Sequence, residues 1–295
     1  MKYEFPMRGE TKELTPEVRA GLAGEFVQLP DGVVHYELGG PEDGPVVALV
    51  HGFSVPYFIW DPTFEALVQA GYRVLRYDLF GRGYSDRPHL RNDKELFNRQ
   101  LTDLLDVLGI KKCLGVIGLS MGGVISANFC VQNPDRVEKL ILIDPAGFPV
   151  EIPGAYKLLL VPGLGELVFG LMDGERLEKA MADDFYDPRY VKAFADLYRP
   201  AMQFKGFRRS LISTIRAGVV DDEVDVYRNL GKMNGPPVML VWGENDESVP
   251  FKFSKTLVSL VPRTQFHPIP NAGHIPHYEQ ASQVNPLILE FLDEH

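Results

Sequence analysis

The chain has 295 residues, of which 45% are hydrophobic and 24% are charged, a composition typical of a soluble globular protein. Its formal net charge of -10 disfavours nucleic acids and anionic membranes as partners, because phosphate groups bind Lys- and Arg-rich surfaces. The length allows one large core, or a core that carries an inserted subdomain.

The N-terminal segment predicts neither a signal peptide nor a membrane anchor. Residues 1–24 are polar and acidic and contain no apolar run of the signal-peptide type. The most apolar stretch, residues 156–172, is interrupted by Pro162 and several glycines, so we expect no integral membrane segment. We therefore expect a cytoplasmic protein that is a monomer or a homodimer.

Short β-rich runs alternate with helical stretches along the chain. Residues 25–29 and 33–38 flank a Pro-Asp-Gly turn signal and predict paired strands. Six further runs predict strands at residues 46–50, 72–77, 114–117, 140–143, 238–242 and 265–269. Helices are predicted at residues 121–132 and 282–293. This alternation predicts an α/β fold with a mostly parallel sheet.

Residues 147–228 break the alternation. They contain no run typical of a buried strand, only helix-like pieces separated by Pro and Gly. A structureless loop of that length is uncommon in a compact domain. We predict a core formed by residues 1–146 and 229–295, with residues 147–228 as a helical cap or lid. A separate small helical domain is the alternative.

A nucleophile motif follows the strand predicted at residues 114–117. Residues 118–122 read Gly-Leu-Ser-Met-Gly, which matches G-x-S-x-G, and a predicted helix begins directly after Ser120. The flanking glycines suit a tight, strained turn, and the N–H groups of the helix favour negative charge near the serine. The motif alone is weak, but its position between a strand and a helix favours Ser120 as a nucleophile over a simple tight turn.

An acyl-transfer site also needs two N–H donors for the oxyanion. His51, Gly52 and Phe53 follow the predicted strand at residues 46–50. We expect the backbone N–H groups of Phe53 and Met121 to form the oxyanion hole. His51 precedes the serine in the chain, so we expect it to shape this loop rather than to act as the base.

His274 is the predicted general base. It follows the last predicted strand, where a neutral imidazole can accept the Ser120 proton and later protonate the leaving group. His277 and Glu279 lie nearby, but His-x-x-His without further ligands is a poor metal motif, so we predict no metal site.

The acid of the triad has two candidates. Asp246 follows the predicted strand at residues 238–242 and is our choice. Asp144 follows the predicted strand at residues 140–143, whose end faces the same edge of the sheet, and it could substitute. Both acids preserve the chain order Ser, Asp, His that is typical of this arrangement.

These motifs together resemble the α/β-hydrolase superfamily, in its capped group with esterases, monoacylglycerol lipases and meta-cleavage C–C hydrolases. The resemblance is carried by residues 51–53, 77–85, 118–123, 242–250 and 271–274, which cover nearly the whole chain apart from the cap. It implies an eight-stranded sheet, a cap after the sixth strand and no cofactor.

Departures from the family patterns narrow the reaction. Epoxide hydrolases and haloalkane dehalogenases of this fold carry Asp at the position of Ser120, so both are disfavoured. C–C hydrolases of the group usually show Asn before the serine and Trp after the histidine, where this chain has Leu119 and Ile275. Perhydrolase-like members often carry Trp at the position of Phe53 and lack a large cap. A carboxylic ester hydrolase is therefore the main prediction.

The substrate is predicted to be a small ester with an apolar acyl chain, cleaved through an acyl-enzyme on Ser120. Tyr57, Leu164 and Phe169 are the predicted pocket residues, although apolar side chains of this kind also fill cores. Two alternatives remain: a C–C bond hydrolase with the same triad, and a ligand receptor of this fold with little or no turnover.

Overall fold

The protein is described here by a computed structural model, which places residues 7–149, 156–171 and 174–294. Met172, the last residue of the predicted apolar stretch, lies outside these described residues. Eight strands form one sheet in the order β1-β2-β4-β3-β5-β6-β7-β8, which confirms the predicted α/β fold. The strands are β1 Glu25–Leu29, β2 Gly32–Gly39, β3 Val46–Val50, β4 Arg73–Tyr77, β5 Cys113–Leu119, β6 Val137–Ile143, β7 Val238–Gly243 and β8 Thr264–Ile269.

The sheet is mostly parallel. β2 pairs antiparallel with both β1 and β4, and the pairs from β4 to β8 are all parallel. The central strands β3, β5 and β6 carry nearly continuous apolar runs because helices cover both of their faces. The carboxyl ends of β3, β5, β6 and β7 therefore meet at one edge of the sheet, where the predicted site residues follow them.

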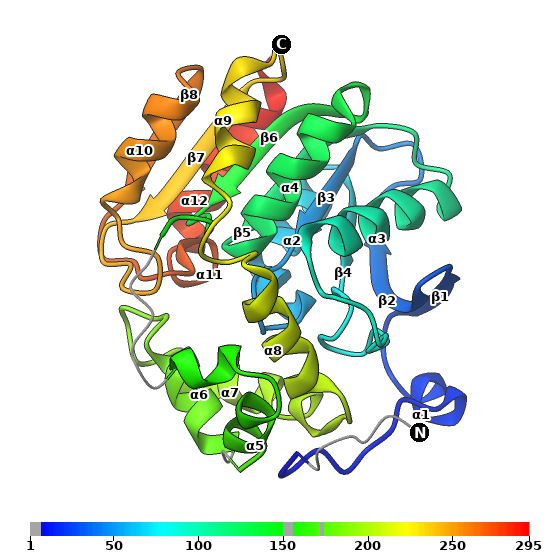
Figure 1. The fold of residues 1–295 in the computed structure, drawn as a ribbon. Helices are drawn as coiled ribbons and strands as arrows, with labels where there is room; N and C mark the ends of the chain where they lie inside the picture. Colours follow the sequence, from blue (N-terminus) through cyan, green and yellow to red (C-terminus); the bar gives the residue numbers. More distant parts are fainter. Residues whose placement is uncertain (1–6, 150–155, 172–173, 295) are drawn as a thin grey trace.

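Helices form a layer on each face of the sheet (Figure 1). One layer contains α3 Lys94–Val107, α4 Met121–Gln132, α9 Val224–Lys232 and α10 Phe253–Leu260. The other contains α2 Asp61–Gln69, α11 Pro276–Glu279 and α12 Ala281–Asp293. Short helices α1 Pro16–Ala20, η1 Tyr57–Trp60 and η2 Pro134–Arg136 lie in the connections.

A group of helices separates β6 from β7 in the chain, as predicted. It consists of η3 Tyr156–Leu160, α5 Leu164–Leu171, α6 Gly174–Ala182, α7 Val191–Tyr198, η4 Ala201–Gln203 and α8 Phe207–Ala217. Helices α5, α6 and α7 lie beyond one end of the sheet (Figure 1). The predicted boundary at residues 228–229 falls inside α9, and α9 packs on α4 beside the sheet. We use "cap" below for η3 through α8.

No helix in the described part of the chain is both long enough and apolar enough to span a membrane. The apolar residues of η3 and α5 form two short helices rather than one long one, because Pro162 and Gly163 separate them.

Candidate active site

Ser120 occupies a strained turn between β5 and α4. Its φ is 53° and its ψ is -120°, a backbone conformation that residues other than glycine rarely adopt. A Cβ atom on Gly118 would lie 2.2 Å from the Gly122 carbonyl oxygen, and one on Gly122 would lie 2.1 Å from the Val50 carbonyl oxygen. The two glycines are therefore required by close backbone contacts, which hold the serine at the edge of the sheet.

The loop after β3 passes directly beside the serine. A Cβ atom on Gly52 would lie 3.2 Å from Cβ of Ser120. The Phe53 N–H donates no backbone hydrogen bond within the described residues, and Met121 is the first residue of α4, where N–H groups have no intrahelical acceptor. Both N–H groups are thus available to a ligand, as an oxyanion hole requires.

His51 has the structural position that the sequence predicts. Its Nε2 accepts a hydrogen bond from the Leu79 N–H at 2.9 Å, and its Nδ1 lies 2.9 Å from the Gly52 carbonyl oxygen. Burial lowers the pKa of this ring to about 4, so the ring is neutral at physiological pH. His51 connects residues 51–54, which we call the oxyanion loop, to the loop after β4, and the hydrogen bonds of its ring among the described residues go to Gly52 and Leu79.

Arg82 holds the same loop from behind, a role that the sequence did not reveal. Its side chain is fully buried, and its Nε donates to the Phe53 carbonyl oxygen at 2.7 Å. Its Nη1 donates to the Phe80 carbonyl oxygen at 3.1 Å, and its Nη2 donates to Thr214 Oγ1 in α8 at 2.8 Å. One guanidinium therefore connects the oxyanion loop to the cap.

His274 and Asp246 form a buried hydrogen-bonded pair. His274 Nδ1 lies 2.8 Å from Asp246 Oδ2. The other carboxylate oxygen accepts the N–H groups of Ser248 at 2.9 Å and Val249 at 2.8 Å, which fix the orientation of the acid. Burial opposes protonation of the His274 ring, but the charge and hydrogen bond of Asp246 and the charge of Asp184 outweigh it and raise the pKa to about 9.

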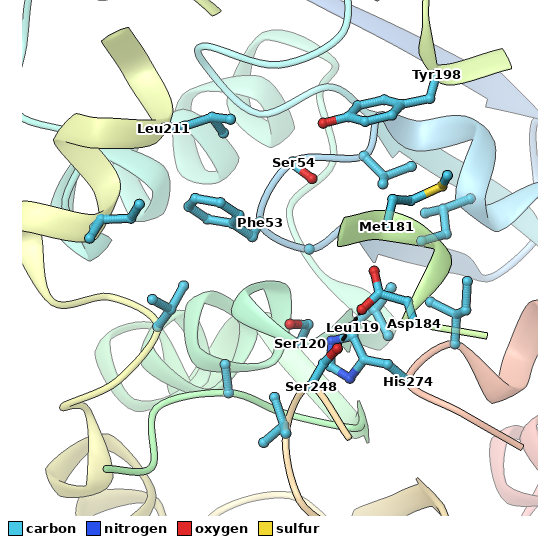
Figure 2. Close-up of a pocket in the computed structure, with 18 of the residues that line it drawn as sticks. Phe53, Ser54, Leu119, Ser120, Met181, Asp184, Tyr198, Leu211, Ser248 and His274 are labelled. Atoms are coloured by element: carbon cyan, nitrogen blue, oxygen red, sulfur yellow. Dashed lines mark hydrogen bonds between the residues drawn. The ribbon is translucent and has the colours of Figure 1, made fainter. Parts of the chain in front are cut away.

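Ser120 and His274 line one cavity together (Figure 2). Hydrogen bonds within the described residues include none between Ser120 Oγ and the His274 ring. In enzymes without substrate this contact commonly tightens only when the substrate binds. The three predicted triad residues are thus gathered at one edge of the sheet, with the acid–base hydrogen bond already formed.

Asp144, the alternative acid, lies beside Asp246 and is completely buried. The Gly243 N–H donates to its Oδ1 at 2.9 Å. The hydrogen bond to His274 Nδ1 goes to Asp246, as the first choice from the sequence expects. Possible metal-ligand atoms of Asp144, Asp246 and His274 lie within 4.8 Å of one another, and two of these residues already share the hydrogen bond between His274 Nδ1 and Asp246 Oδ2.

Glu279 connects the cap to the loop of the predicted base. Its Oε2 accepts the Gly273 N–H at 2.8 Å, and its carboxylate also accepts the N–H groups of residues 186–187 in the cap. The His274 N–H donates to the Asp184 carbonyl oxygen at 2.8 Å. In the sequence Glu279 stood out only as a poor metal ligand, because nothing local indicates which distant amides a carboxylate accepts.

The cavity above Ser120 has a volume of about 350 Å³ and lies between the sheet edge and the cap. Most of its wall is apolar: Phe53, Val55, Leu119, Phe148, Leu159, Phe169, Met181, Leu211 and Val249. In Figure 2, Met181 and Tyr198 of the cap lie across the cavity from Ser120 and His274. The predicted pocket residue Phe169 lines this cavity.

The other two predicted pocket residues, Tyr57 and Leu164, are not among the residues that line it, so these predictions are wrong. The Tyr57 ring stacks on His35 with centroids 4.8 Å apart and lies under the Arg76 guanidinium at 4.6 Å, away from the serine. Leu164 is 40% exposed on the outer side of α5. Periodicity could not separate the two sides of such a short helix, because nearly all of its residues are apolar.

A polar corner of the cavity adjoins His274. The Ser248 hydroxyl donates to Asp184 Oδ1 at 2.5 Å, and both side chains line the cavity (Figure 2). Burial raises the pKa of the Asp184 carboxyl group despite the opposing charge of His274. The cavity therefore combines an apolar wall with a few polar groups close to the reacting atoms.

Comparison with known proteins agrees with this geometry. Residues 45–281 match the family described as alpha/beta hydrolase fold. The chain belongs to this family. The chain is 30% identical over 292 residues to the 2-hydroxy-6-oxononadienedioate/2-hydroxy-6-oxononatrienedioate hydrolase of Comamonas testosteroni. The alignment covers 94% of this chain and 98% of that protein.

Several solved structures have the same fold. A meta-cleavage product hydrolase from Pseudomonas fluorescens superposes with a TM-score of 0.77 at 24% identity, over 92% of this chain and 97% of that one. A thermophilic esterase from Thermogutta terrifontis superposes with a TM-score of 0.76 at 25% identity, over 91% of this chain and 98% of that one. Solved structures with this fold thus include both kinds of hydrolase that the sequence left open.

Proposed function

We propose that this protein is a serine hydrolase in which Ser120 attacks a substrate carbonyl carbon, and that its substrates are 2-hydroxy-6-oxo-dienoates, which it cleaves at a C–C bond. One observation carries the chemistry: Ser120, at a strained turn, shares a mostly apolar cavity with His274, whose ring is held by Asp246. Such a constellation is typical of nucleophilic acyl transfer.

The proposed reaction has two steps. His274 accepts the Ser120 proton as Oγ bonds to the carbonyl carbon, and the N–H groups of Phe53 and Met121 stabilise the oxyanion. The bond from that carbon to the leaving carbon then breaks, and the leaving carbanion takes the proton from His274. Water, deprotonated by His274, then attacks the acyl-enzyme and releases the acid, which restores Ser120.

The relatives support the C–C substrate class. The proteins named as dienoate hydrolases align with this chain over nearly their whole length. The main prediction from the sequence, a carboxylic ester hydrolase, has less specific support among these relatives than its alternative does. Arg176, which lines the cavity, supplies a positive charge that could bind the dienoate carboxylate.

Ester hydrolysis is the second candidate, and two residues favour it. Leu119 and Ile275 line the cavity at the positions where C–C hydrolases of the group usually carry Asn and Trp. Both are buried and apolar, so neither can hydrogen-bond a dienoate. An ester needs only the triad and the oxyanion hole, and a mostly apolar wall suits its acyl chain.

We further infer that the cap closes the cavity over the substrate. Leu159, Phe169, Met181, Tyr198 and Leu211 of the cap all line it. Removal of water from the site would strengthen the electrostatic contribution of the oxyanion hole.

A side-by-side assay tests both candidates. Wild type, Ser120→Ala and the control Ser259→Ala, an exposed serine in α10, are given a 2-hydroxy-6-oxo-dienoate and a panel of p-nitrophenyl esters of rising acyl length. Loss of a triad member should lower kcat by about 10⁴-fold, whereas the control should match wild type. A kcat/KM that is higher for the best ester than for the dienoate would replace the C–C proposal by the second candidate. Full activity in Ser120→Ala would refute both.

A further inference from the structure

Two carboxyl groups and one imidazole are buried in contact behind the reacting serine. Asp144, Asp246 and His274 are 0%, 5% and 7% exposed. A carboxylate oxygen of each acid and a ring nitrogen of the histidine lie within 4.8 Å of one another. Two carboxylates this close cannot both remain charged without a large electrostatic cost when they share only one cation. The question is which of the two carries a proton.

The hydrogen bonds around the two acids are unequal. Asp246 accepts three N–H groups, two from the backbone of residues 248–249 and one from His274. Asp144 accepts one, from the Gly243 N–H, and its Oδ2 receives no N–H or O–H donor within the described residues. Since hydrogen-bond donors stabilise the charged form of a carboxyl group, the charge resides on Asp246 and the proton on Asp144.

We propose that Asp144 is a neutral carboxylic acid that donates its proton to Asp246, so that the two residues together carry one negative charge beside His274. Asp144 is then a positioning residue: it holds the acid that in turn orients the base. The proposal rests on the function proposed above for Ser120 and His274, and it adds a fourth residue to that machinery.

The backbone supports the same assignment. Asp144 has a φ of 42°, in the left-handed region that costs a non-glycine residue free energy, and it lies directly after β6. This strain places its carboxyl group against Asp246. Burial, followed by the charge and hydrogen bond of Asp246, raises the pKa of Asp144 well above its usual value. Two further titratable groups interact with this cluster. The charge of Asp184 acts on His274 and Asp246, and burial together with the charge of His274 lowers the pKa of His277 to about 3.

A shared proton predicts that Asp144 can take over part of the role of Asp246. In Asp246→Asn the neutral amide no longer opposes ionisation of Asp144. The amide can donate to the Asp144 carboxylate and accept from His274 Nδ1–H, so the negative charge moves one residue back instead of being lost.

The test uses Asp144→Asn, Asp246→Asn and the double variant, with Glu247→Gln on the same loop as an exposed control. Asp246→Asn should lose about 10²-fold in kcat, less than the roughly 10⁴-fold typical when a triad acid becomes an amide, and the double variant should show the full loss. A double variant no worse than Asp246→Asn would overturn the proposal. The control should match wild type.

The pH profile of Asp144→Asn separates a neutral from a charged Asp144. We expect kcat to fall several-fold because an N–H donor replaces an O–H donor, with the acid limb of kcat/KM unmoved because no charge is removed. A charged Asp144 would instead have supported the imidazolium, and the limb would move to lower pH by about one to two units.

A spectroscopic measurement is independent of turnover. Infrared difference spectra of ¹³C-Asp-labelled protein, taken near neutral pH, should show the C=O stretch of a protonated, buried carboxylic acid in wild type and in Ser120→Ala, but not in Asp144→Asn. If the band persists in Asp144→Asn, the proton belongs to another residue and the proposal is wrong, even if Ser120→Ala is inactive. Activity in Ser120→Ala would instead refute the proposed function while the band still decides the proton.

Discussion

Arg82 donates through Nε to the carbonyl oxygen of Phe53 at 2.7 Å, in the loop that passes beside Ser120. Burial lowers the pKa of this guanidinium to about 9, so it remains charged at neutral pH. Its other bonds go to the loop after β4 and to Thr214 in the cap. The loop that carries the predicted oxyanion donor Phe53 is therefore held by a charged side chain that does not line the cavity.

Replacing Arg82 by Lys should lower kcat about 10- to 100-fold with a much smaller change in KM. One ammonium group cannot make all three hydrogen bonds of the guanidinium, so the Phe53 N–H would no longer be held in position. Steady-state kinetics on the preferred substrate measures this. Arg99→Lys, at an exposed ion pair with Asp31, is the matched control and should behave as wild type. A second outcome would mean that Arg82 has only a structural role: thermal stability falls, and kcat per folded molecule stays at the wild-type value.

Activity should rise with pH from neutral into the alkaline range. His274 must be unprotonated to accept the Ser120 proton, and its pKa is raised to about 9, so kcat/KM should grow close to tenfold per pH unit below that value. Asp184→Asn removes one of the charges that raise this pKa and should move the limb to lower pH. The exposed neighbour in Asp183→Asn is the control. A wild-type profile that is already flat at neutral pH would contradict the prediction.

His35 should stabilise the fold as a buried cation. Its Nδ1 lies 2.7 Å from Asp78 Oδ2 and its Nε2 lies 2.8 Å from the Ala23 carbonyl oxygen, and both partners can only accept, so both nitrogens carry protons. Burial lowers the pKa of the ring, but the hydrogen bond and charge of Asp78 outweigh this and raise it above the usual value. The stabilisation is full below about pH 6.5 and is lost as the pH rises through the raised pKa.

His35→Gln should therefore lower the free energy of unfolding by about 3 kcal/mol in mildly acidic buffer, with the difference from wild type shrinking as the pH rises. Urea unfolding at several pH values measures it. His267→Gln on β8, a partly exposed histidine, is the control and should keep the pH dependence of wild type. A His35→Gln deficit that grows with pH would show that the ring is neutral in the fold.

Phe169 should limit the size of the substrate. It is 4% exposed and lines the cavity, so Phe169→Ala should lengthen the preferred acyl chain and lower the free energy of unfolding by about 3 kcal/mol. Leu164→Ala, on the exposed side of the same helix, should change stability by less than about 0.5 kcal/mol and leave the chain-length profile as it is. If both variants changed the preferred chain length equally, Phe169 would not be the residue that limits substrate size. Chain-length profiles and urea unfolding provide the measurements.

The sheet and the nucleophile turn were predictable because their signals are local. A buried parallel strand is a continuous apolar run, and the glycines at positions 118 and 122 mark the tight turn in the sequence itself. All eight predicted strands are present, and each end lies within three residues of its predicted position.

The choice between the two acids was not decided by the sequence alone. Asp144 and Asp246 both follow strands that end at the same edge, and only the loop amides of residues 248–249 distinguish them. The roles of Arg82 and Glu279 could not be predicted for a related reason. Each side chain hydrogen-bonds backbone groups of residues that are distant in the chain. Every residue type has these backbone groups, so the sequence does not indicate which of them a side chain will bind.

The Glu279 carboxylate makes the cap and the histidine loop one mechanical unit, because it accepts amides from both. A chimera that receives its cap from a relative would therefore keep the imidazole in register only if the transplanted loop offered two unpaired amides at residues 186–187 and a carbonyl for the His274 N–H. Cap exchange in this protein is thus a problem of joining hydrogen bonds as much as of joining peptide chains.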